Sequence, residues 1–192
     1  MVNYAEDADV RPRRRSDPAR RLARAAARSE DEWRSYARDL CYRQLAAMER
    51  SAQQLRDAME RNLVPDYIAQ ETLDAFCAAN LVNDERFARM YVRSKFTGKT
   101  TTRRVLAQEL ERKGVGKEEI ANALAQISDE DEAAAAIEFA RRKAKSMSQL
   151  DTQTQRRRIY GALGRRGFRT DHIHQAIAAL IEDPQDSPWD TP

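Results

Sequence analysis

The chain has 192 residues, of which 34% are charged and 7% aromatic, and its formal net charge at pH 7 is only +3. Abundant alanine, leucine, arginine, glutamate and glutamine favour helix over strand. No apolar run approaches the roughly 20 residues that span a bilayer, and the N-terminus lacks the apolar segment of a secretory signal. We therefore expect an all-α, cytoplasmic protein with no membrane contact.

Residues 1–28 are basic and low in bulky apolar side chains, and they hold two of the six prolines. A segment of this kind buries too little apolar surface to offset the entropy of ordering. The composition predicts a disordered tail in the free protein.

Residues 29–80 are predicted to form a first repeat of three helices, at 30–48, 51–61 and 66–79. Ser29 and Ser51 each stand three residues before Glu or Gln, which is the capping-box pattern of a helix start. The second helix is expected to end at Asn62, because Asn and Gly enter positive φ at little cost.

Residues 81–128 are predicted to form a second repeat, with helices at 84–97, 101–113 and 117–127. Between the first two helices lies FTGKTTTRR, which resembles a nucleotide-binding loop. Such a loop needs another glycine, where Arg93 stands, and a preceding strand, whereas Phe87 and Tyr91 follow helical spacing. The stretch is interpreted as a turn with one threonine capping the next helix.

Residues 129–181 are predicted to form a third repeat, with helices at 130–147, 153–166 and 170–181. LERKGVGKEEIANALAQI from Leu110 aligns with LGRRGFRTDHIHQAIAAL from Leu163, which matches Gly114 to Gly167. Asp129 and Thr152 are the expected capping residues.

Each repeat is too small to bury a robust core alone. Stacked repeats are therefore expected to share a continuous core within an elongated, curved body. Residues 182–192 form a short acidic tail, whose Trp189 either docks back on the core or stays loose.

Basic residues concentrate in the third repeat, where ten bases between residues 141 and 169 face a single acid, Asp151. This imbalance indicates a surface for phosphate or for an acidic protein, although helical packing leaves part of the run as a solvated face. The candidate binding residues are Arg141, Arg142, Lys143, Lys145, Arg156, Arg157, Arg158, Arg165, Arg166 and Arg169.

No catalytic or metal-binding pattern is recognisable. Cys41 and Cys77 lack a C-x-x-C pairing and are interpreted as small core residues. His172 and His174 are two residues apart, so they point in different directions on a helix, with no acid or cysteine cluster beside them. We expect no enzymatic activity, no cofactor and no metal.

The segments LVNDERFARMYVRSK, RRVLAQELERKGV and RRIYGALGRRGF resemble the RecX family, the small regulators of the RecA recombinase. The resemblance runs from about Ser29 to Leu180 and is most specific between Leu81 and Val115. The motif residues expected to have structural roles are Asp84, Arg86, Phe87, Glu109, Leu110, Lys113, Gly114 and Gly167. Asn83, Gln54 and Asn62 depart from the family's pattern but keep the chemistry of caps and turns.

The resemblance implies three tandem three-helix repeats that bind the RecA filament on single-stranded DNA, in its helical groove. It implies inhibition of filament extension, ATP hydrolysis and strand exchange, which tempers recombination and the SOS response. We expect a monomer whose basic third repeat faces acidic RecA surface or filament DNA. Asp84 and Arg86 are expected to fix a turn, and Phe87 to anchor the core.

Two other functions stay open. A free-standing helix-turn-helix-like DNA-binding protein predicts tight duplex binding without RecA and a steep salt dependence, and a structural adaptor predicts neither. The modest net charge argues against the first, and the resemblance against the second.

Overall fold

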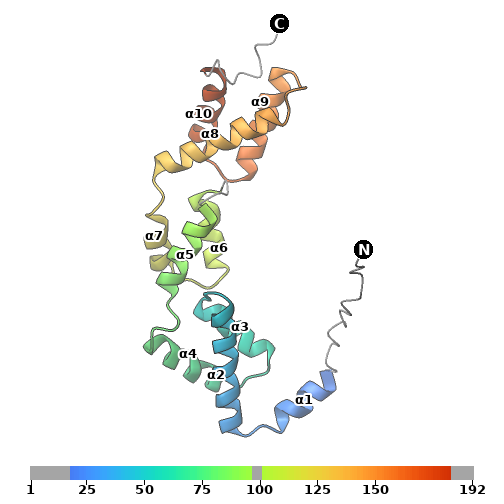
Figure 1. The fold of residues 1–192 in the computed structure, drawn as a ribbon, viewed down its shortest axis with the longest axis vertical. Helices are drawn as coiled ribbons and strands as arrows, with labels where there is room; N and C mark the ends of the chain where they lie inside the picture. Colours follow the sequence, from blue (N-terminus) through green and yellow to red (C-terminus); the bar gives the residue numbers. More distant parts are fainter. Residues whose placement is uncertain (1–17, 97–100, 183–192) are drawn as a thin grey trace, which may run out of the picture.

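The computed structural model describes residues 18–96 and 101–182, and within these ranges it confirms the all-α class (Figure 1). Its helices are α1 (Pro18–Ala26), α2 (Glu30–Ala47), α3 (Ala52–Arg61), α4 (Asp66–Ala78), α5 (Asp84–Phe96), α6 (Arg103–Glu111), α7 (Lys117–Leu124), α8 (Asp129–Lys145), α9 (Thr152–Arg165) and α10 (Thr170–Glu182). From α2 onward, each end lies within three residues of its predicted position.

Helix α1 lies in the segment predicted to be disordered, so that prediction is wrong for residues 18–26. Pro18 occupies the first helical position, where its missing N–H has no intrahelical partner to lose, and strong helix formers follow it. Just after α1, the Arg28 guanidinium lies 4.5 Å from the Trp33 ring centroid and 4.1 Å from that of Tyr36, which fixes the turn into α2. The predictions for residues 1–17 and 183–192 lie outside the described residues.

The nine helices from α2 to α10 form three consecutive repeats of three, stacked along the long axis of a gently curved body (Figure 1). Every helix pair with extensive contacts belongs to one repeat. Each repeat also has its own hydrophobic cluster, represented by Leu55 in the first, Leu106 in the second and Ile159 in the third. The expectation of one continuous core is therefore wrong among the described residues.

The second helix of each repeat ends in the same backbone motif. The residues with positive φ are Leu63 (63°), Gly114 (76°) and Gly167 (83°), and the next N–H bonds back to the carbonyl five residues earlier. The expectation that Asn62 occupies this place is wrong, since its φ is −100°. Its side chain instead donates to the Ala58 carbonyl at 2.7 Å. Leu63, Gly114 and Gly167 therefore occupy equivalent positions in the three turns. The prediction chose Asn62 because asparagine favours positive φ, and so missed the first position by one residue.

The capping predictions hold at three helix starts. Ser29 and Ser51 form capping boxes, and the Thr102 hydroxyl accepts the Val105 N–H at 3.3 Å. One threonine of the FTGKTTTRR stretch thus caps α6, while residues 97–100 lie outside the described ranges.

Two capping predictions are wrong by one residue. Ser128, and not Asp129, caps α8, and Asp151, and not Thr152, caps α9. In each case the predicted residue is the first residue of the helix. The capping oxygen belongs to the residue before it, which accepts the N–H of the residue three positions later.

The cysteines differ from each other. Cys41 is buried, and burial raises the pKa of its thiol to about 11, whereas Cys77 is exposed, so its assignment to the core is wrong. His172 is buried and His174 exposed, which confirms that they point in different directions. None of the described helices combines the length and apolarity needed to cross a membrane.

Candidate functional site

The ten candidate bases are distributed over α8, α9 and the residues just after α9. Lys143 and Arg156 are half-buried, and the other eight are exposed. Helix α8 is polarised, with four acids in its first turn and three bases in its last turn, which suits the helix dipole. Its positive end lies away from the second repeat, so basic charge gathers at the far part of the body (Figure 1).

A groove of about 360 Å³ lies between α8 and α9 and brings four of the ten bases together. Lys143 comes from α8, and Arg157, Arg158 and Arg165 share one face of α9. The remaining lining residues are Met147, Gly161 and Ala162. Among the described residues no acid lines the groove, so these positive charges are concentrated around one concave surface.

Other candidate bases make structural contacts outside the groove. Arg142 lies 3.7 Å from Glu138, and the Arg166 guanidinium lies 4.5 Å from the centroid of the Phe139 ring. Arg169 donates to Asp171 at 3.1 Å and belongs to an ion-pair cluster beside the second repeat. Four of the ten bases therefore line the groove, and these three make contacts that support the fold.

The first joint connects the first and second repeats through the start of α3. The Ser51 hydroxyl donates to the Lys113 carbonyl at 2.6 Å, and the Ala52 N–H donates to the Asp84 carboxylate at 2.9 Å. A residue at the start of α5 thus caps a helix of the preceding repeat. Burial raises the pKa of Asp84, and the bond from Ala52 opposes that rise.

The second joint repeats this arrangement between the second and third repeats. The Thr102 hydroxyl donates to the Arg166 carbonyl at 3.4 Å, and the Arg103 N–H donates to Glu132 at 2.7 Å. The Arg103 side chain adds an ion pair to Glu132 at 2.8 Å, and only 5% of Glu132 is exposed. The second joint therefore uses the same backbone geometry with more charge.

Glycines with positive φ lie against both joints. A Cβ on Gly114 would stand 2.2 Å from the Cβ of Gln53, and one on Gly167 would stand 3.1 Å from the hydroxyl of Thr102. Both backbone conformations favour glycine, although Leu63 adopts the equivalent one in the first repeat, and only Gly114 is also closed in by a rigid neighbouring atom.

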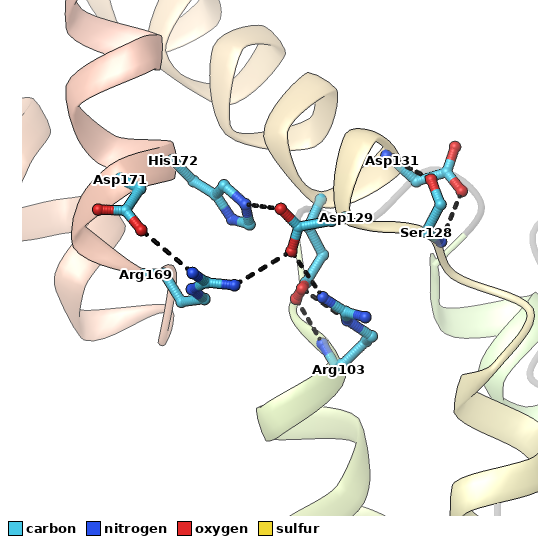
Figure 2. A network of polar contacts seen from close by, with 8 residues as sticks. Arg103, Ser128, Asp129, Asp131, Arg169, Asp171 and His172 are labelled. Carbon is cyan, nitrogen blue, oxygen red and sulfur yellow. Dashed lines mark hydrogen bonds and ion pairs between the residues drawn. The ribbon is translucent and has the colours of Figure 1, made fainter.

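An ion-pair cluster surrounds Asp129 at the second joint (Figure 2). Its carboxylate lies 2.8 Å from Arg103, 3.3 Å from Arg169 and 3.1 Å from Nε2 of His172. The hydrogen bond from His172, followed by the positive neighbours, holds the pKa of Asp129 below its usual value. Three helices, α6, α8 and α10, meet at this side chain.

This cluster also has the composition of a metal site, since Asp129, Glu132 and His172 offer ligand atoms within 4.8 Å of one another. Sequence spacing does not reveal this cluster, because Asp129 and Glu132 lie 43 and 40 residues before His172. Arg103 and Arg169 already neutralise the carboxylates, and a cation would have to displace them. The geometry is that of an ion-pair cluster joining helices.

The motif residues Asp84, Arg86 and Phe87, at the start of α5, make different structural contacts. Arg86 donates to the carbonyls of Asn80 and Leu81, both at 3.2 Å, and thereby closes the turn before α5 as expected. Phe87 is buried in the second core. Asp84 differs from the expectation, because its observed bond crosses to the first repeat instead of closing its own turn.

The motif residues of α6 gather around Tyr91. Its hydroxyl donates to Glu109 at 2.7 Å, and burial together with this carboxylate raises the pKa of Tyr91 to about 12. The Lys113 ammonium lies 5.1 Å from the centroid of the same ring, and Leu110 is fully buried. These residues hold α5 against α6.

The role of Arg103 and Glu132 in connecting the second and third repeats was missed by sequence reasoning. One signal was available: Thr102-Arg103 follows Ser51-Ala52 by 51 residues, so the two helix starts are equivalent. The capping carboxylates, Asp84 and Glu132, are 48 residues apart, and this different spacing hides their common role.

Comparisons with known proteins are consistent with this repeat structure. The family description "RecX, second three-helix domain" matches residues 83–124, and "RecX, third three-helix domain" matches residues 129–177. A regulatory protein RecX of Streptomyces lividans is 33% identical over 147 residues, covering 77% of this chain and 78% of that protein. One of Corynebacterium efficiens is 41% identical over 125 residues, covering 60% of each.

The fold has been observed before. A crystal structure of RecX from Lactobacillus salivarius is similar with a TM-score of 0.71 at 20% identity, covering 79% of this chain and 98% of that chain. The likeness to that structure concerns the fold alone.

Proposed function

This chain belongs to the RecX family, and we propose that it binds the RecA filament on single-stranded DNA and limits filament extension, ATP hydrolysis and strand exchange. The protein is then a regulator without catalytic activity of its own. It acts in the cytoplasm as a monomer lying in the helical groove of the filament, and its effect tempers recombination and the SOS response.

The observation that carries this proposal is the placement of a basic groove at one end of an elongated three-repeat body. A long body can make many weak contacts along a filament, and their sum gives useful affinity. The joints support this use, since they hold the repeats in line through caps and ion pairs.

The third repeat supplies the proposed contact with acidic RecA surface or filament DNA. Arg157 and Arg158 are the best candidates because both are exposed and both line the groove. Arg156 is less suitable, since its Nε is buried among the helices. The motif residues of the middle repeat serve its shape.

The first test is RecA ATP hydrolysis on single-stranded DNA, titrated with this protein at fixed moderate salt. We expect loss of hydrolysis at substoichiometric protein, because blocked filament growth does not require every RecA subunit to be occupied. Unchanged hydrolysis across the titration would contradict the proposal. Unchanged hydrolysis together with tight duplex binding would favour the free-standing DNA-binding protein.

A variant connects the groove to this effect. Arg157→Glu with Arg158→Glu is expected to weaken inhibition while circular dichroism shows intact helicity. The matched control is Arg93→Glu with Lys117→Glu, two exposed bases of the second repeat with the same change in charge. Equal inhibition by both variants would remove the third repeat from the contact.

A further inference from the structure

The groove between α8 and α9 has the charge of an anion site. Lys143, Arg157, Arg158 and Arg165 line it, and among the described residues these four bases make no ion pair. Like charges gathered in one concavity repel each other, and a bound anion relieves that repulsion. A guanidinium presents a planar fork of donors that matches the oxygens of a phosphate.

The floor of the groove is formed in part by a glycine of α9, which has no side chain. Gly161 stands in the interior of α9, where glycine weakens a helix relative to alanine. Its φ is not positive, and an added Cβ would meet only the flexible end of Arg165, at 3.3 Å. Neither backbone conformation nor packing therefore requires glycine here, and the missing side chain leaves the helix backbone accessible between the four bases.

The size of the groove selects the form of the anion. A volume of about 360 Å³ accommodates one sugar-phosphate unit and is too small to hold more than one strand. The apolar part of Met147 and the small Ala162 complete the lining and suit a sugar ring better than a bulk-solvated carboxylate.

We propose that this groove binds the phosphodiester backbone of a single nucleic-acid strand, with Arg157, Arg158, Arg165 and Lys143 around one phosphate and Gly161 beneath it. The inference deepens the proposed function, because it assigns the third repeat to DNA within the filament and not to acidic RecA surface. Backbone contacts carry no sequence information, so binding is independent of base sequence.

The test uses the full chain, a fluorescent oligothymidylate and anisotropy across a range of salt, without RecA. For Arg157→Gln with Arg158→Gln, loss of the one phosphate contact lowers the salt slope by about 0.7 and weakens binding roughly five-fold at 0.1 M salt, from about 0.7 per neutralised phosphate. Arg93→Gln with Lys117→Gln is the control of equal charge. Equal weakening by both pairs would reduce the effect to net charge and overturn the proposal.

A second pair of variants tests the floor. Gly161→Leu is expected to fill the groove and weaken binding, whereas Gly164→Leu, in the same helix with nothing within 4 Å of its added Cβ, leaves binding unchanged. Circular dichroism checks that both keep the fold. Unchanged binding by Gly161→Leu overturns the placement of the phosphate.

Two competitors test the ligand. Polyglutamate displacing the labelled strand as well as unlabelled oligothymidylate would overturn the phosphate assignment, and tighter duplex binding would overturn the single strand. Because RecA is absent, these outcomes are separate from the ATPase test: the protein can inhibit RecA by protein contacts alone even if the groove binds no strand.

Discussion

The two joints solve the same structural problem with different interactions. Both use a hydroxyl at the start of a second helix to donate to the end of the next repeat's second helix, and both use a carboxylate to cap that start. The first joint relies on a short hydrogen bond and close packing against Gly114, while the second surrounds Asp129 with cations. The same arrangement of two repeats can therefore be stabilised either by close packing or by ion pairs.

This difference follows from burial at each carboxylate. Asp84 caps α3 through one N–H, and desolvation disfavours its charge. Glu132 is more deeply buried but has the Arg103 guanidinium beside it at 2.8 Å, which offsets the cost of removing its charge from water. Substitutions should therefore affect the two joints in different ways.

The largest expected effect is at the first joint. Gly114→Ala combines a strained positive φ with a clash against Gln53, and we expect a loss of about 3 kcal/mol in the free energy of unfolding. Gly167→Ala has the strain without a comparable clash and should lose about 1–2 kcal/mol. Urea unfolding followed by circular dichroism measures both. Equal losses would mean that packing does not distinguish the joints.

The next effect is at the second joint. Glu132→Ala leaves a half-buried N–H without its acceptor and the Arg103 guanidinium with Asp129 as its one carboxylate partner, for an expected loss of about 2–3 kcal/mol. Asp84→Ala removes a single cap and should lose about 1 kcal/mol. Glu130→Ala, an exposed acid in the same first turn as Glu132, is the control. The ranking is wrong if Asp84→Ala is the more damaging change.

A smaller contrast concerns the two hydroxyls. Ser51 donates at 2.6 Å and Thr102 at 3.4 Å, so Ser51→Ala should lose about 1.5 kcal/mol and Thr102→Ala about 1 kcal/mol or less. Thermal unfolding of the two variants at matched pH compares them. A larger loss for Thr102→Ala would show that the second joint depends on this bond more than its length indicates.

The smallest effect appears in acid and has opposite signs at the joints. The lowered pKa of Asp129 gives stability that is present above the ordinary value of 3.8 and is lost as the pH falls through the folded-state value. The raised pKa of Asp84 gives stability that is present below 3.8 and is lost as the pH rises through its folded-state value.

Asparagine variants measured by urea unfolding separate these contributions. Between about pH 6 and about pH 3, the destabilisation caused by Asp129→Asn should shrink as the pH falls. Over the same range, the free energy of unfolding of Asp84→Asn should increase relative to that of the unmodified protein as the pH rises. Parallel pH profiles for the two variants would contradict the distinction between the joints.

Much of this fold could be predicted from local sequence. Serines and threonines followed by acids or amides mark helix starts, and apolar spacing marks the buried faces, because both signals act within one or two turns. The predicted αL residue at Asn62 failed for the same reason. The prediction followed the local preference of asparagine for positive φ, whereas the alignment of the three turns places the positive-φ residue at Leu63.

The joints and the groove could be predicted only in part. The spacing of Arg157, Arg158 and Arg165 places them on one face of α9, but the contribution of Lys143 depends on how α8 crosses α9. The cluster around Asp129 depends likewise on residues far apart in the chain, and all four capping hydrogen bonds of the joints use a backbone group, which no residue type reveals. Tertiary packing decides these contacts.

The three separate cores have a consequence for synthesis on the ribosome. The first cluster ends with Val82, between α4 and α5, and takes no residue from α5 onward, since the helices that form it, α2, α3 and α4, contact one another within residues 30–78. Chains rich in local contacts fold quickly, and units at the N-terminus fold before the rest is made. We expect each repeat to reach its native packing soon after it leaves the exit tunnel, with the next repeat then closing the cap on its predecessor.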